Sequence, residues 1–353
     1  MKNNIFKFIC FLIFYFISVN ANSLDQFNFD VTEIQILENG NKFIGTKRGT
    51  VTANNGIIIT ADQFEYNKKI NILNASGNVK IIDSINDYEI YTKKITYEKN
   101  KNLIFTSKGS KAIDLKKDIE ILGENFEYKL EENIITARKN ASIENKIKKY
   151  KINSNFISYL RNDEKIYTQG ITSVLVQSKY NFKSEDLTFL IDTMELFSNK
   201  KSTITDNSNF YSLEKFRYFI DKEELIAEEI LIKTNYNQPS SDKFYFANAT
   251  VNLKNQSFYG KDTNIEIHKD IFENKENDPR IMGVSAIGNK NQTKIQKGIF
   301  TSCKKNEKWT PWSIKAKEII HDKRKKEITY KNALLKIYDF PVLYLPKFFH
   351  PDP

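Results

Sequence analysis

The stretch ADQFEYNKKINILNAS, residues 61–76, decides the fold. Similar sequences recur as TKKITYEKNKNLIFTS at 92–107 and as GENFEYKLEENIITAR at 123–138. In each copy, apolar residues alternate with polar ones on both sides of a short polar turn. Alternation places every second side chain on one face of a strand, whereas a helix would need apolar residues three and four positions apart. The stretch therefore predicts a strand, a polar turn and a second strand.

An aromatic residue marks the same place in each copy. Tyr66, Tyr97, Tyr128 and Tyr159 follow one another at intervals of thirty-one residues, and Phe189 and Tyr218 continue the series at thirty and twenty-nine. Two positions before these residues, on the same face of the predicted strand, stand Phe64, Ile95, Phe126, Ile157, Leu187 and Phe216. The pattern extends from about residue 55 to 337. Because one such unit cannot cover its own apolar face, neighbouring units must stack.

The repeat predicts an all-β protein. We expect an elongated open β-jelly-roll, built from two-strand repeats of about thirty-one residues in two antiparallel layers, over residues 22–267. Residues 268–312 contain Pro, several Gly and both tryptophans, and we expect an irregular insertion there that carries Cys303. Residues 313–353 return to the pattern and are expected to form the last jelly-roll strands.

Residues 1–21 have the layout of an export signal. Lys2 and Lys7 accompany the short apolar run IFKFICFLIFYFISV at 5–19, and Ala21 is the expected last residue before cleavage. An uncleaved membrane anchor is the alternative. Cleavage would remove Cys10 and leave Cys303 as a lone cysteine in an oxidising compartment, which suggests either an external disulfide partner or a free thiol.

Charge and motifs narrow the class of function. The formal net charge is +10, and in an exported protein this favours phosphorylated lipids or polysaccharides over nucleic acid as partners. The chain contains no nucleophile elbow, zinc-protease motif or phosphate-binding glycine loop. His268, His321 and His350 are scattered, and His321 occupies a repeat position where packing or hydrogen bonding is the expected role. We expect no enzyme activity, cofactor or metal, although a lyase or glycosidase with paired carboxylates stays open.

Residues 298–353 resemble the outer-membrane lipopolysaccharide-assembly protein family LptD, also called OstA or organic solvent tolerance protein. The resemblance rests on FTSC at 300–303, the tryptophan after it, KAKEIIHD at 315–322, NALL at 332–335 and PVLYLP at 341–346. Residues 25–267 resemble the family's OstA-type jelly-roll in pattern and topology. The resemblance implies lipopolysaccharide transport and outer-membrane assembly in a Gram-negative cell.

The resemblance also implies partners and a location. The chain would be exported to the periplasmic face of the outer membrane and receive lipopolysaccharide from an OstA-like periplasmic bridge protein. Edge-strand stacking near residues 54–66 would make that contact. The lipid would pass on to an outer-membrane barrel with its plug lipoprotein. In the family a cysteine at the position of Cys303 forms a disulfide with a cysteine of the barrel. Because the family continues into that barrel, we expect residues 313–353 to end at a barrel junction and the chain to be a fragment or the product of a split gene.

Nine inward residues of the repeat would line a lipid path: Phe64, Tyr66, Ile95, Tyr97, Phe126, Tyr128, Ile157, Leu187 and Phe216. The same side chains could equally pack on one another as an ordinary core. Two other functions stay open. One is a self-standing periplasmic protein that bridges lipopolysaccharide with the same fold. The other is a repeat-based structural or adhesive surface protein, which predicts a filled core and no bound lipid.

Overall fold

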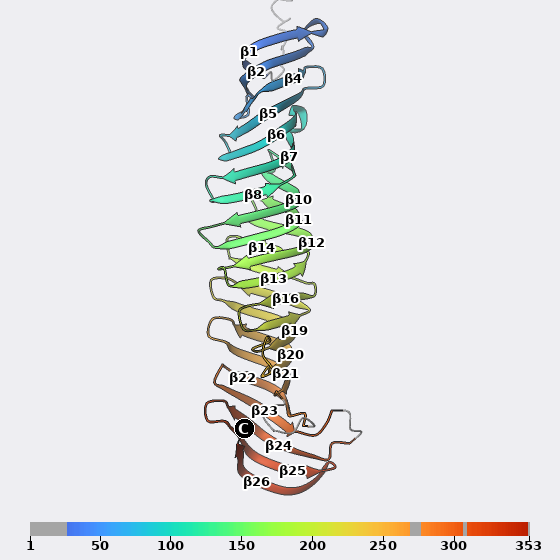
Figure 1. Ribbon diagram of the computed structural model, residues 1–353, viewed down its shortest axis with the longest axis vertical. Coiled ribbons are helices and arrows are strands. Elements are labelled where there is room, and N and C mark those ends of the chain that lie inside the picture. Colours follow the sequence, from blue (N-terminus) through green and yellow to red (C-terminus); the bar gives the residue numbers. More distant parts are fainter. Residues whose placement is uncertain (1–26, 269–276, 306–308, 352–353) are drawn as a thin grey trace, which may run out of the picture.

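The chain forms a tall stack of strands that lie across the long axis of the molecule (Figure 1). This computed structural model describes residues 27–268, 277–305 and 309–351. Its 26 strands join in one continuous sheet, and neighbouring strands run antiparallel. The predicted all-β class is confirmed. In the described ranges only two short 3-10 helices occur, η1 (Glu38–Gly40) and η2 (Lys99–Lys101). The predicted export signal, with Cys10, lies outside these residues.

The strands follow one another through short polar turns. The first third contains β1 (Asn28–Leu37), β2 (Lys42–Thr52), β3 (Ile57–Ala61), β4 (Gln63–Asn67), β5 (Ile72–Asp83), β6 (Tyr88–Glu98), β7 (Leu103–Asp114), β8 (Ile119–Gly123) and β9 (Asn125–Lys129). The middle contains β10 (Ile134–Asn145), β11 (Tyr150–Leu160), β12 (Lys165–Val176), β13 (Tyr180–Glu185), β14 (Thr188–Leu190), β15 (Glu195–Ser198), β16 (Ser202–Thr205), β17 (Phe210–Leu213), β18 (Lys215–Phe219) and β19 (Glu224–Lys233). The last third contains β20 (Lys243–Asn252), β21 (Ser257–Glu266), β22 (Arg280–Gly288), β23 (Gln292–Thr301), β24 (Trp312–Asp322), β25 (Glu327–Ile337) and β26 (Phe340–Pro351).

A bend in the middle of the long strands creates the two layers. In β5 the register shifts between Ser76 and Val79, and Gly77 has a φ of 79°. Positive φ recurs at Gly109 in β7, one repeat further on, and at Gly170 in β12, two repeats after Gly109. Glycine adopts this conformation without steric cost, and a bulge of this kind bends a strand. One half of each long strand therefore lies in the first layer, with Tyr66 and its equivalents, and the other half lies in the second layer.

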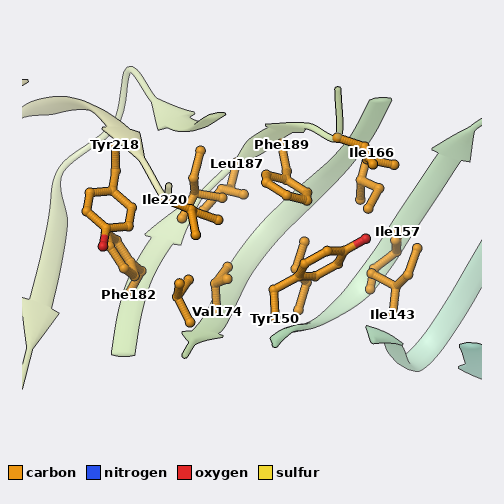
Figure 2. Packing of buried hydrophobic residues seen from close by; sticks show 14 of the residues in the cluster. Ile143, Tyr150, Ile157, Ile166, Val174, Phe182, Leu187, Phe189, Tyr218 and Ile220 are labelled. Carbon is orange, nitrogen blue, oxygen red and sulfur yellow. The ribbon is translucent and has the colours of Figure 1, made fainter. Parts of the chain in front are cut away.

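Each layer turns a ladder of apolar side chains inward. The first-layer ladder pairs Tyr66, Leu73, Tyr97, Ile104 and Tyr128 across successive strands. The second-layer ladder pairs Val51, Ile59, Ile81, Ile90 and Ala112, and it continues through the stack to Leu343. The ladders face each other, since the ring centroids of Phe182 and Tyr218 lie 4.9 Å apart and those of Tyr150 and Phe189 4.7 Å apart (Figure 2). The interior is thus one long apolar core.

The turns of the two layers meet on the side opposite the bends. Asn55 Nδ2, in a second-layer turn, donates to Tyr97 Oη at 2.8 Å and to Asn102 Oδ1 at 3.3 Å in a first-layer turn. One repeat further on, Asn133 Nδ2 donates to Asn86 Oδ1 at 3.1 Å. We call this line of turn-to-turn contacts the seam. It closes the cross-section of the stack, which the sequence predicted to be open.

Part of the segment expected to be irregular forms regular strands. Within 268–312, β22 and β23 are full strands that pair with β21 and β24 and continue the stack. Its glycines serve packing rather than turns. A Cβ on Gly283 would lie 2.2 Å from Ile295 Cγ2, and one on Gly288 would lie 2.8 Å from Phe258 Cζ. Glycine here marks close approach of side chains inside a strand, which its usual role in turns does not predict.

The predicted partner edge also needs correction. The strands nearest residues 54–66, β3 and β4, are each paired on both sides, with β2 and with β5. The unpaired edges of the described sheet are instead those of β1 and β26. None of the helices in the described part of the chain has the length and apolar character to span a bilayer.

Candidate functional site

The nine residues predicted to line a lipid path all point into the interior. Each of them is 4% exposed or less. The layers pack closely around them, because large and small side chains alternate along a row. Phe64 pairs with Ala75, Ile95 with Thr106, and Phe126 with Ala137, each across neighbouring strands. The small residues therefore accommodate their large neighbours, and contact of lipid with these nine residues stays a prediction.

The seam is held by buried polar contacts in the N-terminal half. Tyr128 Oη donates to Asp83 Oδ2 at 2.5 Å, and Tyr159 Oη donates to Asp114 Oδ2 at 2.9 Å. Arg161 Nε lies 2.7 Å from the same carboxylate of Asp114. Burial, followed by nearby negative charge, raises the pKa of both Tyr128 and Tyr159 above the ordinary value. Both tyrosines thus stay neutral donors, and the interior is sealed along these repeats.

A small cavity interrupts the seam further along the stack, toward the C-terminus. Second-layer residues Tyr211, Ile232 and Phe244 line one wall of this cavity, and first-layer residues Val251 and Phe258 line the other. Its volume is about 60 Å³. The turn residues Asn209, Gln256, Asn289, Lys290 and Lys323 surround the mouth. We call this the seam cavity. It joins the apolar interior to the surface, and its mouth carries two lysines.

Polar contacts lie on both sides of the seam cavity along the stack. Toward the N-terminus, Tyr180 Oη donates to Glu223 Oε2 at 2.8 Å. Toward the C-terminus, the buried Asp242 accepts from Lys323 Nζ at 2.6 Å and lies 2.8 Å from His268 Nδ1. Burial acts to raise the pKa of Asp242, but the hydrogen bond with His268 and the charge of Lys323 outweigh it and hold that pKa well below its usual range. Asp242 is thus a carboxylate that joins the two sides of the seam. We call Asp242 and Lys323 the lower clasp.

The seam cavity lies apart from the nine residues predicted from the sequence. Those nine side chains are packed in the interior, whereas the residues that line the cavity fall between 209 and 323. The second-layer residues Tyr211, Ile232 and Phe244 were not predicted. A signal for them exists, because the second-layer ladder to which they belong consists of apolar residues along the stack. The predicted aromatic repeat marks only the first-layer half of each long strand.

Cys303 lies just after β23, half-buried, and its thiol is free in the described part of the chain. Its Sγ lies 3.6 Å from the carbonyl oxygen of Trp312, and its own carbonyl accepts from Arg280. Of the two tryptophans in this region, Trp309 is 64% exposed, whereas Trp312 packs against Phe300 with ring centroids 5.9 Å apart. A disulfide from Cys303 to another chain stays a prediction.

The histidines show no shared site. His321 lies in the first-layer ladder between Thr293 and Ile328 and is 4% exposed. His350 Nε2 lies 2.9 Å from Tyr330 Oη. Among the residues that the structure describes, no three His, Cys, Asp or Glu side chains gather in a way that could hold a metal ion.

The fold and cavity define a class: stacked antiparallel β-arrays with an apolar interior and a polar seam. No protein-family model matches the chain, and no curated protein matches it either. Among solved structures, the chain is similar to LptH from Pseudomonas aeruginosa, described as the LptA-homologous periplasmic component of the lipopolysaccharide transport device. That similarity has 13% identity and a TM-score of 0.30, over 32% of this chain and 82% of LptH. The WD40 domain of SCAP from fission yeast aligns at 6% identity and a TM-score of 0.14, over 94% of this chain and 91% of that one. Similarities of this size carry no argument about function.

Proposed function

We propose that the chain binds acyl chains of lipopolysaccharide between its two layers and passes the lipid along the stack. The seam cavity supports this most directly. Its walls are apolar, its mouth carries Lys290 and Lys323, and the second-layer ladder runs on unbroken to Leu343. A lipid with phosphate groups next to its acyl chains is complementary to this arrangement, because its chains face the walls and its phosphates face Lys290 at the mouth.

The energetics favour a covered path. Exposing one methylene to water costs about 0.8 kcal/mol, so a bare fourteen-carbon chain costs roughly 10 kcal/mol. The seam cavity, at about 60 Å³, has room for about two waters, so an acyl chain enters only where the layers part at the seam. Movement is passive, driven by further lipid arriving behind. The proposal therefore needs no enzyme activity, cofactor or metal.

The sheet edges suit the proposed partners. The outer edge of β26 is unpaired, and its residues Phe340, Tyr344 and Phe349 are 75%, 57% and 61% exposed. An unpaired edge with apolar side chains can pair with a strand of another protein. In the proposal, an OstA-like bridge protein pairs with β1, and the outer-membrane barrel with its plug lipoprotein contacts the β26 end, with Cys303 in disulfide to the barrel. The chain is exported and works at the periplasmic face of the outer membrane.

Site-specific photocrosslinking tests the proposal. A photoreactive phenylalanine analogue at Ile232 or Phe258 of the full chain, produced in Gram-negative cells, should form a covalent adduct with lipopolysaccharide. The same analogue at Tyr245, on the outer face of β20, is the matched control and should form none. Absence of the adduct at both Ile232 and Phe258, with the chain folded and exported, would overturn the proposal.

One observation favours the structural alternative. The interior is tightly filled around the N-terminal anchors, as a repeat-based structural or adhesive protein predicts. Solvent extraction of the purified chain followed by mass spectrometry separates the two functions. Lipid transport predicts phosphorylated lipid in the extract, and the structural alternative predicts an extract without it.

A further inference from the structure

A second depression lies on the outside of the stack, on the opposite face of the strands that wall the seam cavity. It measures about 510 Å³ and spans the outer face of β15, β18, β19, β20 and β21. Its centre is one cross-strand row in which Phe197, Arg217, Ile226, Thr250 and Tyr259 are successive partners. We call this depression the outer hollow.

Small inward residues account for the depression. Directly beneath the outer hollow, the inward row reads Ser198, Phe216, Ala227, Ala249, Gly260 and Ala286, and all of these except Phe216 are small. A Cβ on Gly260 would lie 2.2 Å from the ring of Phe246, so the backbone of β21 sinks onto that ring. A sheet that sinks inward leaves a concave outer surface. The outer hollow is therefore built into the packing of the sheet.

The central row combines apolar platforms with a cation. Ile226 and Tyr259 are 43% and 45% exposed, and the Arg217 guanidinium lies 5.5 Å from the ring centroid of Phe197. Successive strands are about 4.8 Å apart, so the row from Phe197 to Tyr259 spans roughly 19 Å. The distance between successive strands is close to the length of one sugar unit in an extended glycan. Aromatic and aliphatic faces pack on the C–H faces of sugar rings.

A second row supplies hydrogen-bonding groups. Lys215, Glu228, Asn248 and Lys261 are successive partners beside the central row. Lys215 Nζ lies 3.0 Å from Glu228 Oε2, and Arg217 Nη1 lies 2.7 Å from Glu195 Oε1. These ion pairs balance two of the three cations, which leaves the charge of Lys261 in excess. The carboxylate and the amide can each bind sugar hydroxyls, and Lys261 favours an acidic group.

From these two rows we infer that the outer hollow binds an extended oligosaccharide that carries carboxylate groups. A protein partner would need a continuous apolar centre, and here the central row contains Arg217 and is flanked by the charged row. The inference is independent of lipid transport, since it concerns the other face of the sheet.

Calorimetric titration of the full chain tests the inference. Tetragalacturonate, an acidic tetrasaccharide, should bind saturably and at least tenfold more tightly than neutral cellotetraose. Tyr259→Ala should weaken binding of both sugars at least tenfold, and Lys261→Met should abolish the preference for the acidic one. Tyr245→Ala removes an outer-face tyrosine of β20 beyond the hollow and should change neither affinity.

Three results would overturn the inference: no saturable binding of either sugar, equal losses in Tyr259→Ala and Tyr245→Ala, or an unchanged acidic preference in Lys261→Met. Circular dichroism of each variant shows whether the strands are intact. The lipid photocrosslinks at Ile232 and Phe258 should be the same in Tyr259→Ala as in the unchanged chain, so failure of one proposal is distinguishable from failure of the other.

Discussion

Asp114 shows how single residues hold the seam. Its carboxylate is fully buried, and it accepts from Tyr159 Oη, from the guanidinium of Arg161 and from the backbone amides of Lys116 and Lys117. A buried charge is tolerated only when its lone pairs are satisfied in this way. Asp114, at the end of β7, is thereby joined across the seam to Tyr159 of β11 and to Arg161. The seam is thus held by a few residues with several partners each.

Asp114→Asn should destabilise the chain by about 3–5 kcal/mol, because the variant leaves the Arg161 guanidinium buried without its carboxylate. Urea unfolding followed by far-ultraviolet circular dichroism measures the change. Glu65→Gln is the matched control, since its ion pair with Lys42 is exposed to solvent and contributes little to stability. Equal effects of the two substitutions would show that the seam contributes no more than a surface ion pair.

At the scale of elements, the strands and their turns were predictable from the sequence. The alternation in 61–76 and its copies gives β4 to β7 and β9 to β10 correctly, because one face of each strand is buried. The bends were harder to predict. Gly77 and Gly109 signal them, but at Lys139 and Asn140 ordinary residues adopt positive φ under tertiary constraint. The seam cavity could not be predicted, since it depends on which turns meet across the layers.

Gly260 illustrates an element whose packing the sequence does not reveal. Gly260→Ala should destabilise the chain by about 1–3 kcal/mol, because the new methyl group would collide with the Phe246 ring beneath β21. The double variant Gly260→Ala, Phe246→Leu should recover part of that loss, since the smaller side chain makes room. Urea unfolding of the two single variants and the double variant gives the coupling. If the two losses simply add, the close approach of β21 to Phe246 is not what constrains position 260.

At the scale of the whole molecule, the two halves of the stack differ in how the seam is held. Near the N-terminus, successive repeats are joined by Asp83 with Tyr128 and by Asp114 with Tyr159. Around the seam cavity, the joins are further apart, at Tyr180 with Glu223 and at the lower clasp. Sheets packed with this uneven support open locally where the contacts are fewest. The C-terminal half is therefore where the two layers separate most easily.

Asp242→Asn should weaken the lower clasp and widen the seam cavity. Removing the carboxylate leaves Lys323 without its buried anion, which costs about 3 kcal/mol or more at pH 7. The exposed Asp339→Asn is the control and should cost almost nothing. Amide hydrogen exchange measured by mass spectrometry should show faster exchange in the turns 234–241 and 323–326, by roughly a hundredfold, and little change in β5 to β12. Uniform acceleration through the whole stack would mean that the seam does not open locally.

The pH dependence of the same variant provides an independent check. The pKa of Asp242 is lowered in the folded chain, so its contribution to stability is fully present above the unfolded value of about 3.9 and is lost as the pH falls below it. The difference in unfolding free energy between Asp242→Asn and the unchanged chain should therefore shrink as the pH falls from about 4 toward about 3. Urea unfolding at these pH values measures it. A difference that grew over this range would mean that Asp242 does not act as a paired carboxylate in the clasp.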